Sequence, residues 1–146
     1  MEDDTIKLLR ECNAGVKMGI SSLDDVMGHV QDGKMRELLY RSRQTHERLG
    51  DTAHEYLTRY HDDGKEPATM AKMMSWVKTN VKLAGEDSDR TAADLLTDGC
   101  NMGIKSLYRY LHQYPVAEKD AQKLAGEIIE AEEELSLIHI SEPTRP

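Results

Sequence analysis

Apolar residues recur at steps of three and four residues through most of the chain. In the first segment they are Ile6, Leu9, Val16, Ile20, Leu23, Met27 and Val30. These steps place side chains on one face of an α-helix. Asp32 and Gly33 then interrupt the pattern. No segment shows the alternation of a β-strand, so the spacing predicts an all-α fold.

Turn signals divide the rest of the chain into further predicted helices. Proline is tolerated in the first turn of a helix but stops a helix that precedes it, and glycine often caps a helix end. The predicted helices are residues 34–62, capped by Gly64; 67–84, begun by Pro67; 88–114, from an N-cap at Ser88 to Pro115; and a last helix from about Val116.

Two segments 88 residues apart resemble one another. Residues 8–17 read LLRECNAGVK and residues 96–105 read LTDGCNMGIK. The identical pairs are Leu8 and Leu96, Cys12 and Cys100, Asn13 and Asn101, Gly15 and Gly103, and Lys17 and Lys105. A weaker match, offset by 86, places His46 opposite Glu132. The repeat predicts two helical hairpins joined by a crossover, which makes a four-helix bundle.

The last twelve residues, LSLIHISEPTRP, break the charged helical pattern before them. They resemble the in-frame translation of a transposase-type sequencing adapter. We therefore exclude residues 135–146 as a non-native tail. The expected domain is 1–134, with hairpin 1 at about 5–63, a crossover helix at about 67–84 and hairpin 2 at about 88–134.

Charge and composition exclude several classes of partner. The net charge is -8 and no basic block is present, which argues against nucleic-acid binding. No apolar run approaches the roughly 20 residues that a membrane helix needs. The start, from Met1 to Asp4, lacks the features of a signal peptide. We expect a cytoplasmic protein with no membrane or nucleic-acid partner.

The predicted order of hairpin, helical crossover and hairpin, with its internal repeat, resembles the ferritin-like bundle proteins. The segments ECNAGVKMGISSLDDV and DGCNMGIKSLYRYLHQYP are similar to those of uncharacterised small ferritin-like proteins from anaerobic Gram-positive bacteria. The resemblance covers residues 3–134. It implies a ferritin-like four-helix bundle and attaches no activity to the chain, so function is argued from sites.

Metal-binding ferritin-like proteins use a carboxylate from one helix and a Glu-x-x-His from the next in each hairpin. Here Asp51 and His54 have that three-residue spacing, and antiparallel pairing brings Glu11 to the level of Ala53. Glu11, Asp51 and His54 are therefore the candidate metal ligands, for iron or manganese. Against this, Asp51 and His54 lie off the apolar face, where polar residues are usually solvated.

The second hairpin does not repeat this ligand pattern. Gly99 stands where Glu11 would recur, and the counterparts of Asp51 and His54 fall within the adapter-like tail. A bundle without metal is the preferred interpretation.

Several other residues are assigned structural roles. Asn13 and Asn101 lie on or beside the apolar face, where we expect hydrogen bonds that fix helix register. Cys12 and Cys100 are expected to be buried free thiols. His46 and Glu132 flank the core face, where they could make a charge-assisted contact across the bundle.

Gly15, Gly19, Gly99 and Gly103 lie inside predicted helices, where each glycine costs about 1 kcal/mol relative to alanine. Something should offset that cost. Either the helices approach closely at these positions, or the bundle leaves space there for a ligand.

Two functions follow from the sequence. The preferred one is a non-catalytic helical bundle without cofactor, active in assembly or protein interaction through self-association. The alternative is a ferritin-like iron or manganese protein that stores metal or handles peroxide.

Overall fold

The computed structural model describes residues 2–62 and 88–137, and these residues form four α-helices and no β-strand. The helices are α1 (Glu2–Met27), α2 (Gly33–Arg59), α4 (Ser88–Gln113) and α5 (Lys119–Ser136). The all-α prediction is confirmed for this part of the chain. None of the described helices is long and apolar enough to cross a membrane.

A short connection joins α1 to α2 at the predicted break. The backbone N–H of Met35 donates to the Asp32 carboxylate over 2.8 Å, which caps the start of α2. Val30, in the connection, is buried against the end of the core. The predicted break at Asp32 and Gly33 is confirmed because Asp32 supplies an N-cap.

The end of α2 differs from the prediction. The helix ends at Arg59, and His61 adopts a left-handed conformation with φ 57°. The Asp62 N–H donates back to the Leu57 carbonyl over 3.0 Å, which closes the last turn. The Asp62 carboxylate pairs with Arg10 of α1. Gly64, the predicted cap, lies outside the described residues.

The last helix begins later than expected. Pro115 follows the end of α4, as predicted, but α5 starts at Lys119 and not near Val116. Ala117 is buried, and the Glu118 N–H donates to the Thr5 hydroxyl over 2.8 Å. Ala117 and Glu118 are thus held by contacts with the rest of the bundle, and α5 begins after them.

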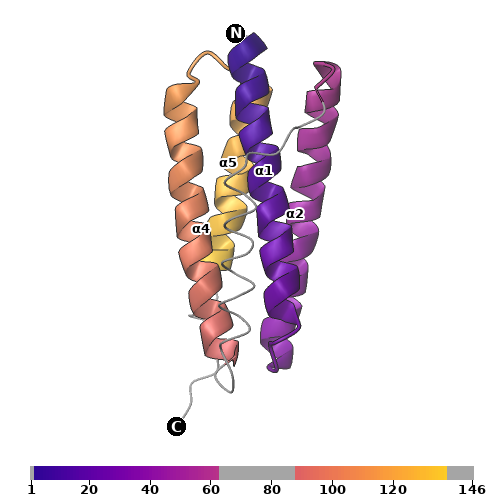
Figure 1. Ribbon diagram of the computed structural model, residues 1–146, viewed down its shortest axis with the longest axis vertical. Coiled ribbons are helices and arrows are strands. Elements are labelled where there is room, and N and C mark those ends of the chain that lie inside the picture. Colours follow the sequence, from indigo (N-terminus) through magenta and orange to yellow (C-terminus); the bar gives the residue numbers. More distant parts are fainter. Residues whose placement is uncertain (1, 63–87, 138–146) are drawn as a thin grey trace.

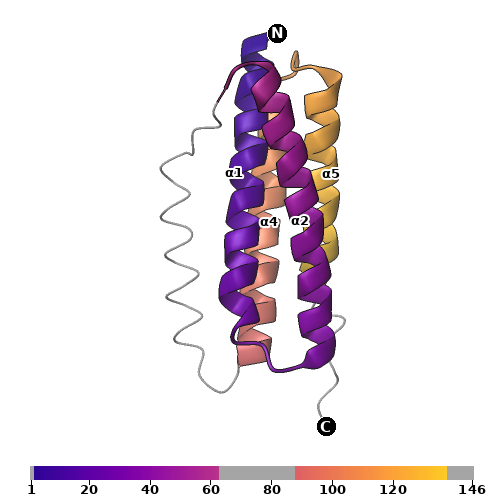
Figure 2. The same ribbon diagram turned by 90° about the vertical axis from the view of Figure 1, so that its right-hand side faces the viewer.

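The four helices form a bundle in which α1 and α5 run one way and α2 and α4 the other (Figure 1). α1 packs against α2 and α4, α5 packs against α4 and α2, and α1 also contacts α5. The end of α2 and the start of α4 lie at opposite ends of the bundle (Figure 2). The predicted crossover helix at 67–84 lies outside the described residues.

The apolar core consists of two clusters along the bundle axis. One includes Leu8, Leu9, Cys12, Val16, Leu49, Ala53, Leu57, Leu107, Ala121, Leu124, Ile128 and Ile129. The other includes Leu23, Val26, Met35, Leu39, Ala92, Ala93, Leu96, Cys100 and Leu135. Leu135, the first residue of the adapter-like segment, is thus buried in α5, whereas residues 138–146 lie outside the described residues.

Candidate functional site: a buried histidine and glutamate

His46 and Glu132 meet inside the bundle, between α2 and α5. Their residues are 0% and 6% exposed, and Nε2 of His46 lies 3.9 Å from Oε1 of Glu132. The other ring nitrogen, Nδ1, lies 2.8 Å from the Ser42 carbonyl oxygen. Because a carbonyl oxygen only accepts, Nδ1 carries a proton and donates it. The contact across the bundle that the sequence suggested is therefore present.

The pair forms a polar layer between the two apolar clusters. On α2, His46 lies between Leu39 of one cluster and Leu49 of the other. On α5, Glu132 lies between Ile128 and Leu135 in the same way. A polar layer within an otherwise apolar seam restricts how the helices can slide, because any slip would bury its polar atoms against apolar side chains.

Two of the four glycines singled out from the sequence make room for this pair. A Cβ added at Gly19 would lie 2.8 Å from Cδ2 of His46, and one added at Gly103 would lie 2.8 Å from Oε2 of Glu132. Both distances are shorter than side-chain atoms tolerate. By contrast, a Cβ at Gly15 or Gly99 would meet nothing within 4 Å. Of the two alternatives left open by the sequence, close approach holds at Gly19 and Gly103, where a buried side chain from another helix fills the space beside the glycine.

A cavity of about 40 Å³ adjoins the pair. His46 and Glu132 line it together with Gly19, Gly99 and Cys100. That volume suffices for one water molecule, whereas pockets for organic ligands are roughly 300–1,000 Å³. Among the described residues, Nε2 of His46 is buried without a hydrogen-bond partner. The cavity can therefore hold a bridging water but not an organic substrate.

Opposing effects act on the pKa of His46. Burial lowers it, because an apolar site disfavours the charged imidazolium. The nearby Glu132 carboxylate, with its negative charge, and the hydrogen bond to the Ser42 carbonyl raise it, and together they exceed burial. The pKa of His46 therefore lies above its ordinary 6.5. The imidazolium form is favoured because it places a proton between the two side chains.

The two thiols are buried, as predicted, and they are free. Burial raises the pKa of Cys12 to about 12. Burial also raises the pKa of Cys100, and the adjacent Glu132 carboxylate raises it further. Since the thiolate is the nucleophile and the metal ligand, neither cysteine is activated for chemistry in this environment.

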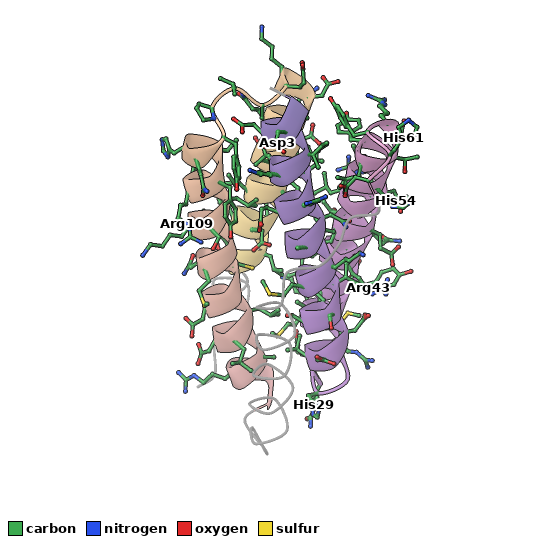
Figure 3. The ribbon with its side chains drawn as sticks, turned by 45° about the horizontal axis from the view of Figure 1, so that its top comes forward. Asp3, His29, Arg43, His54, His61 and Arg109 are labelled. Atoms are coloured by element: carbon green, nitrogen blue, oxygen red, sulfur yellow. The ribbon has the colours of Figure 1, made fainter. Side chains whose placement is uncertain are left out.

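The three candidate metal ligands are not gathered in the bundle core. Glu11 is half-buried on α1, whereas Asp51 and His54 are exposed on α2. His54 points away from the other helices (Figure 3). Within residues 2–62 and 88–137, no three His, Cys, Asp or Glu side chains are grouped so that they could hold a metal ion.

The two asparagines of the repeat occupy different environments. Asn13 is buried on α1, but Asn101 is exposed on α4. The prediction that both lie on or beside the apolar face, where an amide needs a hydrogen bond, is confirmed in burial for Asn13 but not for the exposed Asn101. The other matched pairs Leu8 and Leu96, and Cys12 and Cys100, are buried on both helices, so the two segments differ in burial at the asparagine.

The two glycines that contact the buried pair can be matched in the sequence, but at a different offset. Residues 18–23 read MGISSL and residues 102–107 read MGIKSL, so five of six residues are identical at an offset of 84. This alignment places Gly19 opposite Gly103, the two glycines that contact the buried pair. Sequence reasoning missed the equivalence because offsets of 84 and 88 differ by about one helical turn and so match the same helix face.

Comparisons with protein-family models, curated proteins and solved structures find no match for the chain. The function is therefore inferred from the geometry of the described residues.

We expect the stability of the bundle to fall as the pH rises above about 6.5. The pKa of His46 is raised in the folded state, so the pair stabilises the fold fully below the unfolded pKa of 6.5. This contribution is lost as the pH rises through the folded pKa. Urea denaturation at several pH values between neutral and mildly alkaline measures this loss as a fall in the free energy of unfolding. Glu132→Gln is the control, because a neutral amide removes the charge that raises the pKa of His46. If the free energy of unfolding of the wild type and that of Glu132→Gln change with pH in the same way, this expectation is wrong.

Proposed function

We propose that the chain is a non-catalytic helical bundle that functions in assembly, by binding a second copy of itself. The observation that supports a non-catalytic role is that the buried polar pair leaves no room for a substrate. His46 and Glu132 are the described core residues whose chemistry could serve catalysis, and they contact each other beside a cavity of about 40 Å³. Their arrangement suits a register-fixing layer better than a substrate site.

The surface supports an interaction role. Several large apolar side chains are exposed on the described helices and connections, among them Tyr40, Met102, Tyr108 and Val116. Single exposed apolar residues are common on protein surfaces. A contact between two copies becomes more specific where complementary charges accompany such residues.

The proposal includes a ferritin-like arrangement of the bundle. Its support is the antiparallel pairing of α1 with α2 and of α4 with α5, and the position of the end of α2 far from the start of α4 (Figure 1). The recurrence of MGI-x-SL on α1 and α4 supports an origin by duplication of one hairpin.

Two measurements on the full chain test the proposal. Sedimentation equilibrium over a wide concentration range should detect a dimer, and a chain that stays monomeric throughout would overturn self-association. Elemental analysis of protein purified without chelator should find no stoichiometric transition metal. About two iron or manganese atoms per chain, as in di-metal bundles, would favour the alternative function.

A further inference from the structure

Gly99, in the interior of α4, packs differently from Gly103 one turn later. A Cβ added at Gly103 would crowd Glu132, whereas one added at Gly99 would meet no atom within 4 Å among the described residues. Glycine inside a helix is less favourable than alanine. Close approach of another helix therefore does not offset that cost at Gly99.

Gly99 instead borders the cavity of about 40 Å³ beside the buried pair. His46, Glu132 and Ser22 supply the polar part of its lining, and most of the other residues around it are apolar. Because an added Cβ at Gly99 meets no described atom, a larger side chain at this position has the cavity to enter. Glycine here keeps that space open.

Nε2 of His46 is a buried polar atom that needs a hydrogen-bond partner in this cavity. The side chain is fully buried, and no partner for Nε2 is found within residues 2–62 and 88–137. Oε1 of Glu132 lies 3.9 Å away, whereas hydrogen bonds between nitrogen and oxygen are about 2.7–3.2 Å long. The two groups are therefore close but do not hydrogen-bond directly.

A water molecule matches both the volume of the cavity and the spacing of these two atoms. About 10–15 Å³ of accessible space is enough for one water molecule. A water about 2.8 Å from both Nε2 and Oε1 lies beside the line that joins them, because 3.9 Å is less than twice that length. The cavity adjoins the pair and so offers that position.

Water also suits both protonation states of His46. Nδ1 donates its proton to the Ser42 carbonyl oxygen in either state. In the imidazolium, Nε2 can donate to the water, which then donates to Glu132. In the neutral ring, Nε2 is an acceptor, and the water can donate one proton to Nε2 and the other to the carboxylate. A direct contact would then place two acceptors against each other.

We propose that the cavity beside Gly99 binds one ordered water molecule, which bridges Nε2 of His46 and the carboxylate of Glu132. The water completes the polar layer between the two apolar clusters, and Gly99 keeps the space that the water occupies. This site lies inside the bundle, so the inference does not depend on whether two copies associate.

A high-resolution crystal structure of the full chain tests the site directly. We expect one water within about 3.2 Å of both Nε2 of His46 and a carboxylate oxygen of Glu132. An ion at about 2.0–2.2 Å from Nε2 would identify a metal site and overturn the proposal. Direct contact between the imidazole and the carboxylate, with no density in the cavity, would also overturn it.

Magnetic relaxation dispersion of the water oxygen nucleus counts long-lived internal water molecules in solution. Gly99→Val should lower this count by one, because a valine methyl group takes the place of the water. Gly15→Val is the matched control. Gly15 is the counterpart of Gly99 at the offset of 84, its added Cβ likewise meets no described atom within 4 Å, and it is not among the residues that line this cavity.

The solution outcomes are equally decisive. Loss of one internal water in Gly99→Val, with an unchanged count in Gly15→Val, would support the proposal. An unchanged count in a folded Gly99→Val, or the same loss in both variants, would show that the water is not bound in this cavity. Circular dichroism checks that the variants fold, and the crystal structure of the wild-type chain decides the question if valine prevents folding.

Discussion

Replacing Gly19 by alanine is expected to destabilise the bundle by about 1 kcal/mol, because overpacking a core costs roughly 1–3 kcal/mol and alanine regains about 1 kcal/mol of helix propensity. The new Cβ would lie 2.8 Å from Cδ2 and 3.1 Å from Nε2 of His46. The imidazole ring is rigid and fully buried. It would have to move, which weakens its hydrogen bond to the Ser42 carbonyl.

Gly15→Ala, one turn earlier on the same helix, is the matched control. Its Cβ would meet nothing within 4 Å, so we expect stabilisation by about 0.5–1 kcal/mol through helix propensity alone. Gly103→Ala and Gly99→Ala form a second pair, in which the crowded neighbour is the end of the flexible Glu132 side chain, so we expect a smaller loss at Gly103 than at Gly19. Urea denaturation of the four variants measures the free energy of unfolding. Equal effects at Gly19 and Gly15 would show that His46 does not pack against Gly19.

Replacing His46 by leucine at pH 6 is expected to destabilise the bundle by about 3–5 kcal/mol, the usual cost of leaving a buried charge without its partner. Leucine keeps roughly the shape of the imidazole but leaves the Glu132 carboxylate in the core. Adding Glu132→Leu should recover most of that loss, because a buried ion pair can be replaced by apolar residues at little cost or with a gain of about 1–4 kcal/mol.

A double-mutant cycle of His46→Leu, Glu132→Leu and both together quantifies the pair. The cycle should give a coupling free energy of about 2 kcal/mol or more if the two side chains interact as the structure shows. Additive effects of the two single changes would contradict a direct contact. The oligomeric state of the double variant should be measured as well. A polar layer that fixes helix register can also specify the oligomeric state, so a change in that state would show that the pair has this second role.

Periodicity was sufficient to predict the helices, because each apolar stripe in the sequence becomes one face of the core. Asp32 is a clear example: a side chain that caps α2 follows directly from its position before an apolar repeat. The contact of His46 with Glu132 could also be predicted, from their matched positions at an offset of 86.

Features that depend on tertiary contacts were not predictable in this way. The start of α5 at Lys119 depends on a hydrogen bond between Glu118 and Thr5, which are 113 residues apart in the chain. Asn101 is exposed, although the offset of 88 matches it with the buried Asn13. Offsets of 84 and 88 differ by about one helical turn, so the sequence pattern scarcely distinguishes the two alignments.

The polar layer between the two apolar clusters has a consequence for protein engineering. Leu39 and Leu124 belong to different clusters, with His46 and Glu132 between them. Substitutions at distant sites without shared partners usually have additive effects on stability, within about 0.3–0.5 kcal/mol. The two ends of this bundle therefore behave as separate design units, each of which can be repacked without redesigning the other.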